Sequence, residues 1–262
     1  MANTPRYMEI ANELRQQITT GRLRPGDQLP TEAELAKQHE TARNTIRDAI
    51  GILKNLRLVE ARSGIGTFVA IPPVRYKVTL TPDERTGFGG GEGKAWVAEA
   101  EAKGRTARTG DTEVHIKVAT PVMAEALNVS TTESLVGRHQ ERYIDEVAWS
   151  LQTSYYPMDF VTRGATELLR NTDIDQGTMD YLEESLGIKQ VGYRDEIVVR
   201  PPDAREVDFF NIPDSGAVQI LEHRRTAFDA HGHPCRYTVT AYPTDRNIFV
   251  IEAMLPVPDE TA

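Results

Sequence analysis

The stretch from residue 29 to residue 69 places the strongest constraint on how this chain can fold. Glu34 follows Thr31 by three residues, which is the spacing of a capping box at the start of a helix. A second helix is predicted directly after it, with Thr41 as its N-cap. Its apolar residues recur at helical spacing and are Ile46, Ala49, Ile50 and Leu53. A strand, a turn with two glycines and a returning strand follow over residues 58–69. This order of parts is typical of a winged helix-turn-helix.

The polar side of the second helix carries the residues that could read DNA. Arg43 and Arg47 lie one turn apart near its N-terminus, with Asn44 and Thr45 between them. Arginine can bind guanine with two hydrogen bonds, and asparagine can do the same for adenine. Beside the glycine turn, Arg62 places a positive charge where a phosphate could lie. A helix with two arginines is, taken alone, more often a solvated face, but the order of parts favours a DNA interface.

Three blocks between Tyr7 and Val69 carry a resemblance to a known family. PGDQLPTEAELA, ARNTIRDAI and GIGTFV make this part of the chain similar to the bacterial GntR transcription regulators. The resemblance implies a homodimer that binds palindromic operator DNA. By position it implies DNA contacts from Thr31, Glu32, Arg43, Asn44, Thr45, Arg47, Gly64 and Gly66. Ala33 stands where many members have a basic residue, so no base contact is assigned to it.

The charge of the chain is divided unevenly. The whole sequence has 30 Lys+Arg against 39 Asp+Glu, a formal charge of −9. Residues 1–75 nevertheless hold 11 Lys+Arg and 8 Asp+Glu, so the acidity belongs to the remainder. A positive segment joined to an acidic one predicts that DNA is contacted at one end only.

Composition also limits the classes of protein to consider. Cys235 is the only cysteine, so an intrachain disulfide and a thiolate metal cluster are both excluded. No apolar run reaches the length of a membrane span, and the N-terminus lacks the apolar core of a signal peptide. We therefore expect a cytoplasmic protein with no membrane partner.

The domain boundaries follow from prolines and glycines. Consecutive prolines after Ile71 predict that the winged helix-turn-helix domain occupies residues 1–73. Residues 74–94 are expected to be a linker that contains a strand near residues 75–80 and a glycine-rich segment. That segment lacks the first glycine and the hydroxyl residue of a phosphate-binding loop, so it predicts a mobile loop. Whether this loop closes over a ligand is left open. Residues 95–262 form the second predicted domain.

The second domain contains an apparent internal repeat. Residues 113–128 and 196–211 each read as a strand, a proline and a short helix, and two long strands follow each of them. Two such units predict an α+β fold with one antiparallel sheet of pseudo-two-fold character, covered by helices on one face. The seam between the halves would be a natural cleft.

This half also resembles a family, over about residues 111–250. The segments ALNV, LQTSYYP, DAHGHP and TAYPTDRN are similar to the UTRA effector-binding domain of the HutC branch of GntR regulators, which shares its fold with chorismate lyase. The resemblance implies a small effector bound between the halves and dimerisation through this domain. The expected effector contacts are Arg138, Gln140, Gln152, Ser154, Arg236 and Tyr242. Gln152 and Arg236 stand where sugar-phosphate-binding members have carboxylates, which favours an anionic effector or a different ligand scaffold.

Motifs for catalysis are missing from the sequence. It has no Gly-x-Ser-x-Gly and no His-Glu-x-x-His segment. His231 and His233 fit a hairpin turn better than a metal site, so no catalytic residue, metal or cofactor is predicted. We expect a transcriptional repressor that a small molecule releases from DNA, and not an enzyme. Two alternatives stay open: an enzyme of chorismate-lyase-like fold, and a constitutive DNA-binding protein without an effector.

Overall fold

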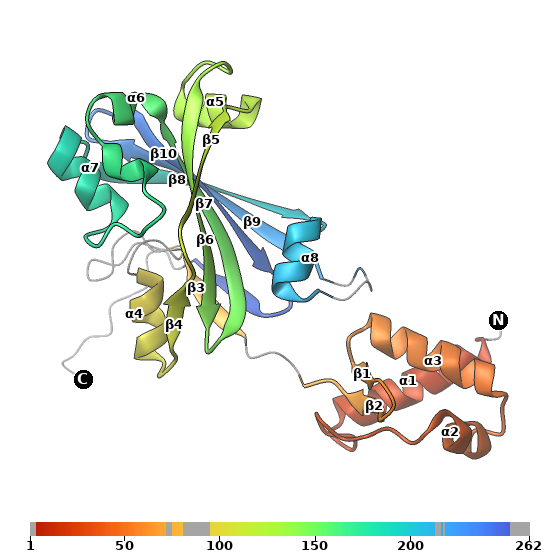
Figure 1. Cartoon of the computed structure of the whole chain (residues 1–262). Coiled ribbons are helices and arrows are strands. Elements are labelled where there is room, and N and C mark those ends of the chain that lie inside the picture. Colours follow the sequence, from red (N-terminus) through yellow and green to blue (C-terminus); the bar gives the residue numbers. More distant parts are fainter. Residues whose placement is uncertain (1–3, 72–74, 81–94, 213–215, 217, 252–262) are drawn as a thin grey trace, which may run out of the picture. The chain divides into compact units, whose positions relative to one another are not determined.

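The computed structural model describes residues 4–71, 75–80, 95–212, 216 and 218–251. The chain divides into two compact units: residues 1–74 with 213–218, and residues 75–212 with 219–262. Helices and a mostly antiparallel sheet give the expected α+β class (Figure 1).

The first unit is a small helical domain with a β-hairpin. Its elements are α1 (Arg6–Thr19), α2 (Glu32–Gln38), α3 (Arg43–Asn55), β1 (Val59–Arg62) and β2 (Gly66–Val69). Each helix contributes side chains to one core, in which Ile10, Leu35 and Ile46 are almost fully buried. The apolar stripe predicted on the second helix is confirmed, because Ile46, Ala49, Ile50 and Leu53 are all buried.

One local prediction in this unit is wrong. Thr41 is not the N-cap of α3; Ala42 holds that position, and no side chain caps the helix. The backbone N–H of Thr41 instead donates to the carbonyl of Ala36 in α2, at 3.0 Å. Glu40 before it has a positive φ of 49°, so this segment closes the end of α2 before α3 begins.

The second unit is built on a seven-stranded sheet. Its strand order is β4-β6-β7-β10-β9-β8, and β5 also pairs with β6. These strands are β4 (Ala107–Thr109), β5 (Glu113–Val118), β6 (Ser134–Ile144), β7 (Val147–Pro157), β8 (Gln190–Arg200), β9 (Ile220–Asp229) and β10 (Pro234–Pro243). The strand expected near residues 75–80 is present as β3 (Tyr76–Thr79), which pairs in parallel with β11 (Asn247–Val250).

The central strand pair has the symmetry that the internal repeat predicts. On β7 and β10, Thr153 lies opposite Val239. On either side of this pair, Leu151 lies opposite Ala241 and Tyr155 opposite Tyr237. If the two halves are exchanged so that the Tyr-Pro end of β7 falls on the Tyr-Pro end of β10, the pair Leu151–Ala241 falls on the pair Tyr155–Tyr237. An approximate two-fold axis therefore passes through the sheet at Thr153 and Val239.

Helices cover both faces of the sheet, so the prediction of a single covered face is wrong. The helices of the repeats, α5 (Pro121–Leu127) and α8 (Ala204–Phe210), contact β10 and β7 respectively. Residues between the repeats form α6 (Met158–Thr162), the 3-10 helix η1 (Thr166–Leu169) and α7 (Thr178–Leu186). These pack with Val136 and Tyr156, whereas α5 packs with their neighbours Leu135 and Tyr155. Adjacent strand residues point to opposite faces, so the two helix groups lie on opposite sides.

A third apolar cluster lies at one end of the sheet. The helix α4 (Ala95–Ala102) places Trp96 against Trp149, with ring centroids 5.2 Å apart. Tyr242 meets Trp149 edge-on, and strands β3 and β11 contribute Val78 and Phe249 to the same cluster.

Of the helices in the described ranges, none is long and apolar enough to cross a bilayer.

Candidate DNA interface and polar face of the sheet

The start of α2 is fixed by the predicted capping box. The Thr31 hydroxyl accepts a hydrogen bond from the Glu34 N–H at 3.3 Å, and the Glu34 carboxylate accepts one from the Thr31 N–H at 2.8 Å. This second bond holds the pKa of the Glu34 carboxyl below its usual range. The box fixes Thr31 and the neighbouring Glu32 at the exposed N-terminus of the helix.

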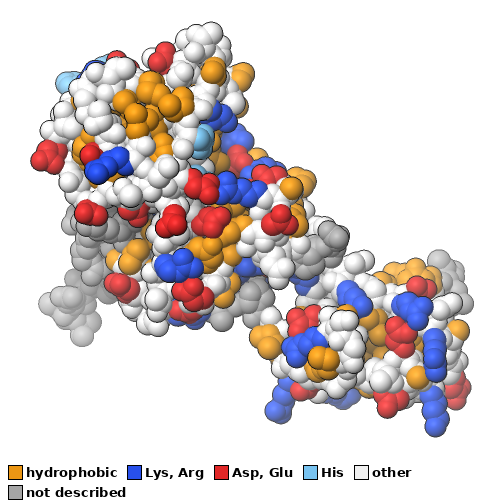
Figure 2. All heavy atoms as spheres, in the orientation of Figure 1, with side chains coloured by type: hydrophobic (Ala, Val, Ile, Leu, Met, Phe, Trp, Pro, Cys, Tyr) orange, Lys and Arg blue, Asp and Glu red, His pale blue; other side chains and the backbone are white. Residues whose placement is uncertain are grey.

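An ion pair joins α2 to the predicted recognition helix α3. Arg47 Nη2 lies 3.0 Å from Glu32 Oε2, and both side chains are exposed. The hydrogen bond from Arg47 to Glu32 raises the pKa of the arginine. Arg43 and Asn44, one turn earlier on α3, are also exposed. Arg43 makes no ion pair within the described residues. Lys and Arg side chains project from this unit on the face shown in Figure 2.

The β1–β2 hairpin forms the predicted wing. Arg62 donates to Glu60 at 2.8 Å, and its guanidinium lies 4.3 Å from the centre of the Phe68 ring. Gly64 and Gly66 both have positive φ, as the tight turn requires. A Cβ on Gly66 would lie 2.5 Å from Gln28 Nε2.

No role was predicted from the sequence for Gln28, which holds the wing, or for Ile65, which lies at its tip. Gln28 Nε2 donates to the carbonyl of Ile65 at 3.0 Å and so fixes the turn to the segment before α2. The Ile65 side chain is 65% exposed at the tip. The isoleucine between two glycines is the feature of the sequence that could have indicated this exposed position.

In the second unit, polar side chains form rows across the face that carries α6, η1 and α7. We call it the polar face. One row joins Arg138, Ser154, Thr238, Arg225 and Asp195 on neighbouring strands. The next joins Gln140, Gln152, Thr240 and His223. Apart from Gln140 and Asp195, which are partly exposed, these side chains are buried. The alternation expected for strands β6 and β7 is confirmed, and most of this face is buried.

Arg138 binds the backbone of the segment that covers the sheet. Its guanidinium donates to the carbonyls of Leu168, Arg170 and Thr172 at 3.0, 2.8 and 2.6 Å. Burial lowers the pKa of Arg138. The structure thus places this expected effector residue as an anchor for residues 167–172.

Three other expected effector residues also have partners within the chain. Gln140 donates to Asp173 Oδ1 at 2.5 Å. Ser154 shares a hydrogen bond with Thr238 at 2.9 Å. Arg236 donates to Gln190 Oε1 at 2.9 Å.

The remaining two are Tyr242 and Gln152. Tyr242 is fully buried in the aromatic cluster with Trp149 and Phe249. Gln152 is 5% exposed, and its Oε1 has no hydrogen-bond partner among the described residues. The same holds for the hydroxyl of Ser150, which is fully buried. A buried polar atom without a partner costs about 1–3 kcal/mol, so such atoms indicate a place for a polar ligand or water.

Sequence reading missed the contribution of β9 to this face. Asp195 Oδ2 lies 2.6 Å from Arg225 Nη2, and Asp195 Oδ1 lies 3.0 Å from His223 Nε2. Burial raises the pKa of the Asp195 carboxyl, but the hydrogen bonds from Arg225 and His223 outweigh it and lower the pKa overall. The Arg225 guanidinium lies over the Tyr193 ring at 3.8 Å.

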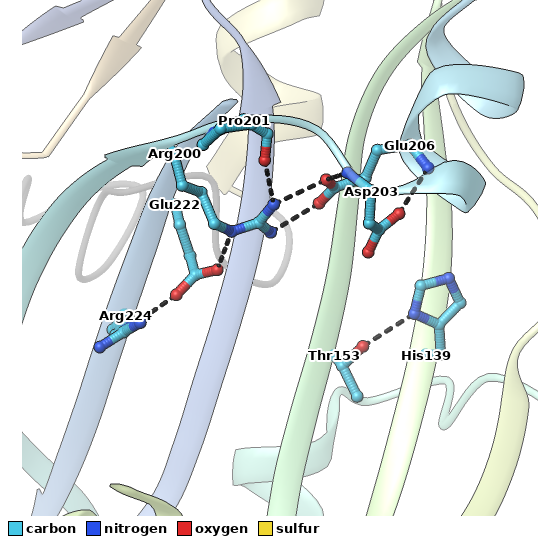
Figure 3. Close-up of polar contacts among 8 residues, drawn as sticks. All are labelled: His139, Thr153, Arg200, Pro201, Asp203, Glu206, Glu222 and Arg224. Carbon is cyan, nitrogen blue, oxygen red and sulfur yellow. Dashed lines mark hydrogen bonds and ion pairs between the residues drawn. The ribbon is translucent and has the colours of Figure 1, made fainter. Parts of the chain in front are cut away.

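The opposite face carries a second polar cluster near α8 (Figure 3). Arg200 contacts Glu206 with two hydrogen bonds of 2.7 Å and Glu222 with one of 2.5 Å. These hydrogen bonds, chiefly those to Glu206, raise the pKa of Arg200. Glu206 also completes a capping box with Asp203 at the start of α8. The cluster therefore fixes α8 to the sheet.

The histidines of the hairpin turn are held by backbone bonds. Asp229 Oδ1 accepts hydrogen bonds from the N–H groups of His231 and His233, both at 2.8 Å. The predicted turn between β9 and β10 is confirmed. Among the residues that the structure describes, no three His, Cys, Asp or Glu side chains gather as metal ligands.

Comparison with known proteins assigns both units. The model described as "Bacterial regulatory proteins, gntR family" matches residues 6–69, and the model of the UTRA domain matches residues 102–247. The HTH-type transcriptional repressor NagR of Bacillus subtilis is 23% identical over 94% of this chain and 93% of its own. The repressor MngR of the Escherichia coli mannosyl-D-glycerate transport/metabolism system is 38% identical over 30% of this chain and 32% of its own.

A solved structure has the same fold. PhnF from Mycobacterium smegmatis aligns with a TM-score of 0.55 at 23% identity, and the alignment covers 94% of this chain and all of that one.

Proposed function

The chain belongs to the GntR family of bacterial regulatory proteins and carries a UTRA domain, and we propose that it is a repressor released from its operator by a small anionic effector. The family assignment makes it a transcriptional regulator with a DNA-binding unit and an effector-binding unit. Repression, a palindromic operator, a homodimer and release by effector are the parts that we propose.

The proposed DNA contacts come from α2, α3 and the wing. Arg43, Asn44 and Arg47 would reach base edges from the N-terminal turns of α3, with Thr45 beside them. Thr31 would lie against the backbone, as would Arg62, Gly64 and Gly66 of the wing. Glu32 would contact a base amino group such as cytosine N4, because the phosphates repel a carboxylate. In a homodimer, two such units would occupy major grooves about one helical turn apart, which requires a palindromic site.

The proposed effector site is the polar face between the two halves of the sheet. The Ser150 hydroxyl and the Gln152 carbonyl have no hydrogen-bond partner in the described part of the chain, and this observation carries the proposal. Gln152, Ser154, Arg236 and Tyr242 would contact the effector. An arginine cannot accept hydrogen bonds from sugar hydroxyls but binds carboxylates and phosphates well, which supports an anionic ligand.

Arg138 and Gln140 have a different proposed role. Their hydrogen bonds run to Leu168, Arg170, Thr172 and Asp173, in the segment over the polar face. An effector that displaces or tightens this segment would change the second unit without touching DNA. To favour the DNA-free state, it must bind that state more tightly, and a 100-fold preference supplies about 2.7 kcal/mol.

The test combines thermal stability with DNA release. Anionic metabolites, including sugar phosphates and dicarboxylates, are screened for those that stabilise the full chain. A ligand at 100 times its dissociation constant adds about 2.7 kcal/mol. We expect a hit to lower affinity for operator DNA and to be recovered unchanged after incubation. Turnover of the hit would favour the enzyme alternative, and stabilisation without any change in DNA affinity would contradict release by effector.

A further inference from the structure

The strand β8 ends the sheet with a long free edge. It has 11 residues and pairs only with β9 within the described part of the chain. Arg194, Glu196, Ile197 and Val199 are all exposed on it, with Val199 at 61%. Exposed edges are ordinarily protected by proline, charged side chains, bulges or short strands. Residues 190–200 contain no proline or lysine, but β8 carries the charges of Arg194, Asp195 and Glu196 and a register shift between Gln190 and Gly192. Such an edge accepts another strand only where the charges of that strand complement its own.

We propose that this edge pairs with the β8 strand of a second copy of the chain, antiparallel and centred on Asp195. In a two-fold arrangement, each residue and its partner are equally far from the centre. Centring on Asp195 places Arg194 of each copy opposite Glu196 of the other copy. It also places Tyr193 opposite Ile197 on the other face of the strand.

Charge complementarity selects this register over its neighbours. A centre on Arg194 or Glu196 would place identical charges opposite each other, which is destabilising. A centre on Ile197 would place Arg194 opposite Arg200. Asp195 faces its own copy at the chosen centre, but its carboxylate is already paired with Arg225 and His223 in its own subunit. Arg194 and Glu196 lie 3.4 Å apart within one strand, so the same two charges can pair across the interface.

The other edge of the sheet is a weaker candidate. There β5 has six residues, about half the length of β8. Its Glu113 is already bound to Arg205 from α8 at 3.2 Å. A two-fold pairing of β5 centred on His115 would set Glu113 against Lys117, which provides a matched control for the experiment.

The proposed register would connect the subunit interface to the polar face. Asp195 ends the row of polar residues that starts at Arg138 and runs through Arg225. The centre of the dimer would therefore lie two strands away from β10, which carries the proposed effector contacts Arg236 and Tyr242. The inference rests on the homodimer of the proposed function and names the surface that forms it.

The test is a charge exchange on the full-length protein, measured by sedimentation over a concentration series. Arg194→Glu alone and Glu196→Arg alone each set like charges opposite each other twice, and we expect each to weaken dimerisation about tenfold or more. The double variant restores opposite charges and should dimerise as the wild type does. Lys117→Glu on β5 should have no effect. Hydrogen exchange of β8 amides should slow as the protein concentration rises.

The outcomes separate this inference from the proposed function. A wild-type dimer that is unaffected by the single variants, or not restored in the double variant, overturns the β8 pairing and leaves the homodimer standing. Dissociation caused by Lys117→Glu instead would assign the interface to β5. A wild-type chain that is monomeric at every concentration overturns both.

Discussion

Arg47 of α3 and Glu32 of α2 form an ion pair between two helices, with Nη2 and Oε2 3.0 Å apart. Both residues are proposed DNA contacts. In the free protein, the Glu32 carboxylate holds the Arg47 guanidinium through this ion pair. Exposed ion pairs contribute about 0–1 kcal/mol to stability, so DNA can replace this partner at little cost.

Replacing Arg47 by Ala should weaken operator binding by about 1–3 kcal/mol, because a bidentate contact to a base would be lost. Binding to random DNA should weaken much less. Fluorescence anisotropy with both duplexes at one salt concentration measures the difference, and Arg15→Ala on α1 serves as the control for lost charge. Equal losses on both duplexes would mean that Arg47 contacts only phosphate.

Replacing Arg138 by Ala should lower the free energy of unfolding by about 3 kcal/mol, since one buried and two partly buried carbonyls would lose their donor. Urea denaturation followed by circular dichroism measures this. Arg163→Ala, at an exposed ion pair with Asp159, should change it by less than about 0.5 kcal/mol. Unchanged stability in the Arg138 variant would show that the carbonyl contacts contribute little.

Replacing Gln152 by Leu should leave the free protein as stable as the wild type or more stable, because a buried acceptor that has no partner among the residues described disappears. The same variant should fail to release DNA when the effector is added. Thr238→Val, which removes the partner of Ser154, should instead lower stability. Normal effector response in the Gln152 variant would exclude this residue from the site.

Stability should fall as the pH drops from neutral, and His139 is one cause. Burial lowers the pKa of His139 to about 4, while the unfolded chain has the usual value near 6.5. Between these values the unfolded state binds more protons, so stability is lost as the pH falls through this window. From pH 7 to pH 5 the loss from His139 should be about 2 kcal/mol. A His139→Asn variant, compared by urea denaturation at both pH values, should lose less; an identical pH dependence would contradict the assignment.

The first unit was largely predictable because its signals are local. The Thr31–Glu34 capping box and the apolar stripe of α3 depend on residues within one or two turns of each other. Thr41 was misassigned because the closing of α2 takes its N–H, which no local propensity reveals. In the second unit, the covering of both faces of the sheet was not predicted, since apolar residues that alternate along a strand do not tell which later segment will cover them.

The polar face was only half predictable, for a specific reason. On β6 and β7 the strand period of two assigned Arg138 and Gln140 to one face and Gln152 likewise, although residues 138–142 are polar throughout. On β9, Glu222 and Arg224 point to one face while His223 and Arg225 point to the other. A strand that is polar on both faces does not show which of its residues lie under the covering helices. The partners of Arg138 lie about thirty residues away in sequence, and only the fold brings them together.

Selection of DNA from a random pool by the full-length chain tests the central claim most directly. A homodimer with two recognition helices predicts enrichment of a palindrome whose half-sites lie about one helical turn apart. Arg43→Ala and Arg47→Ala should each change the base preference at one position of each half-site. Absence of any enriched sequence, or a single site without symmetry, would contradict the account.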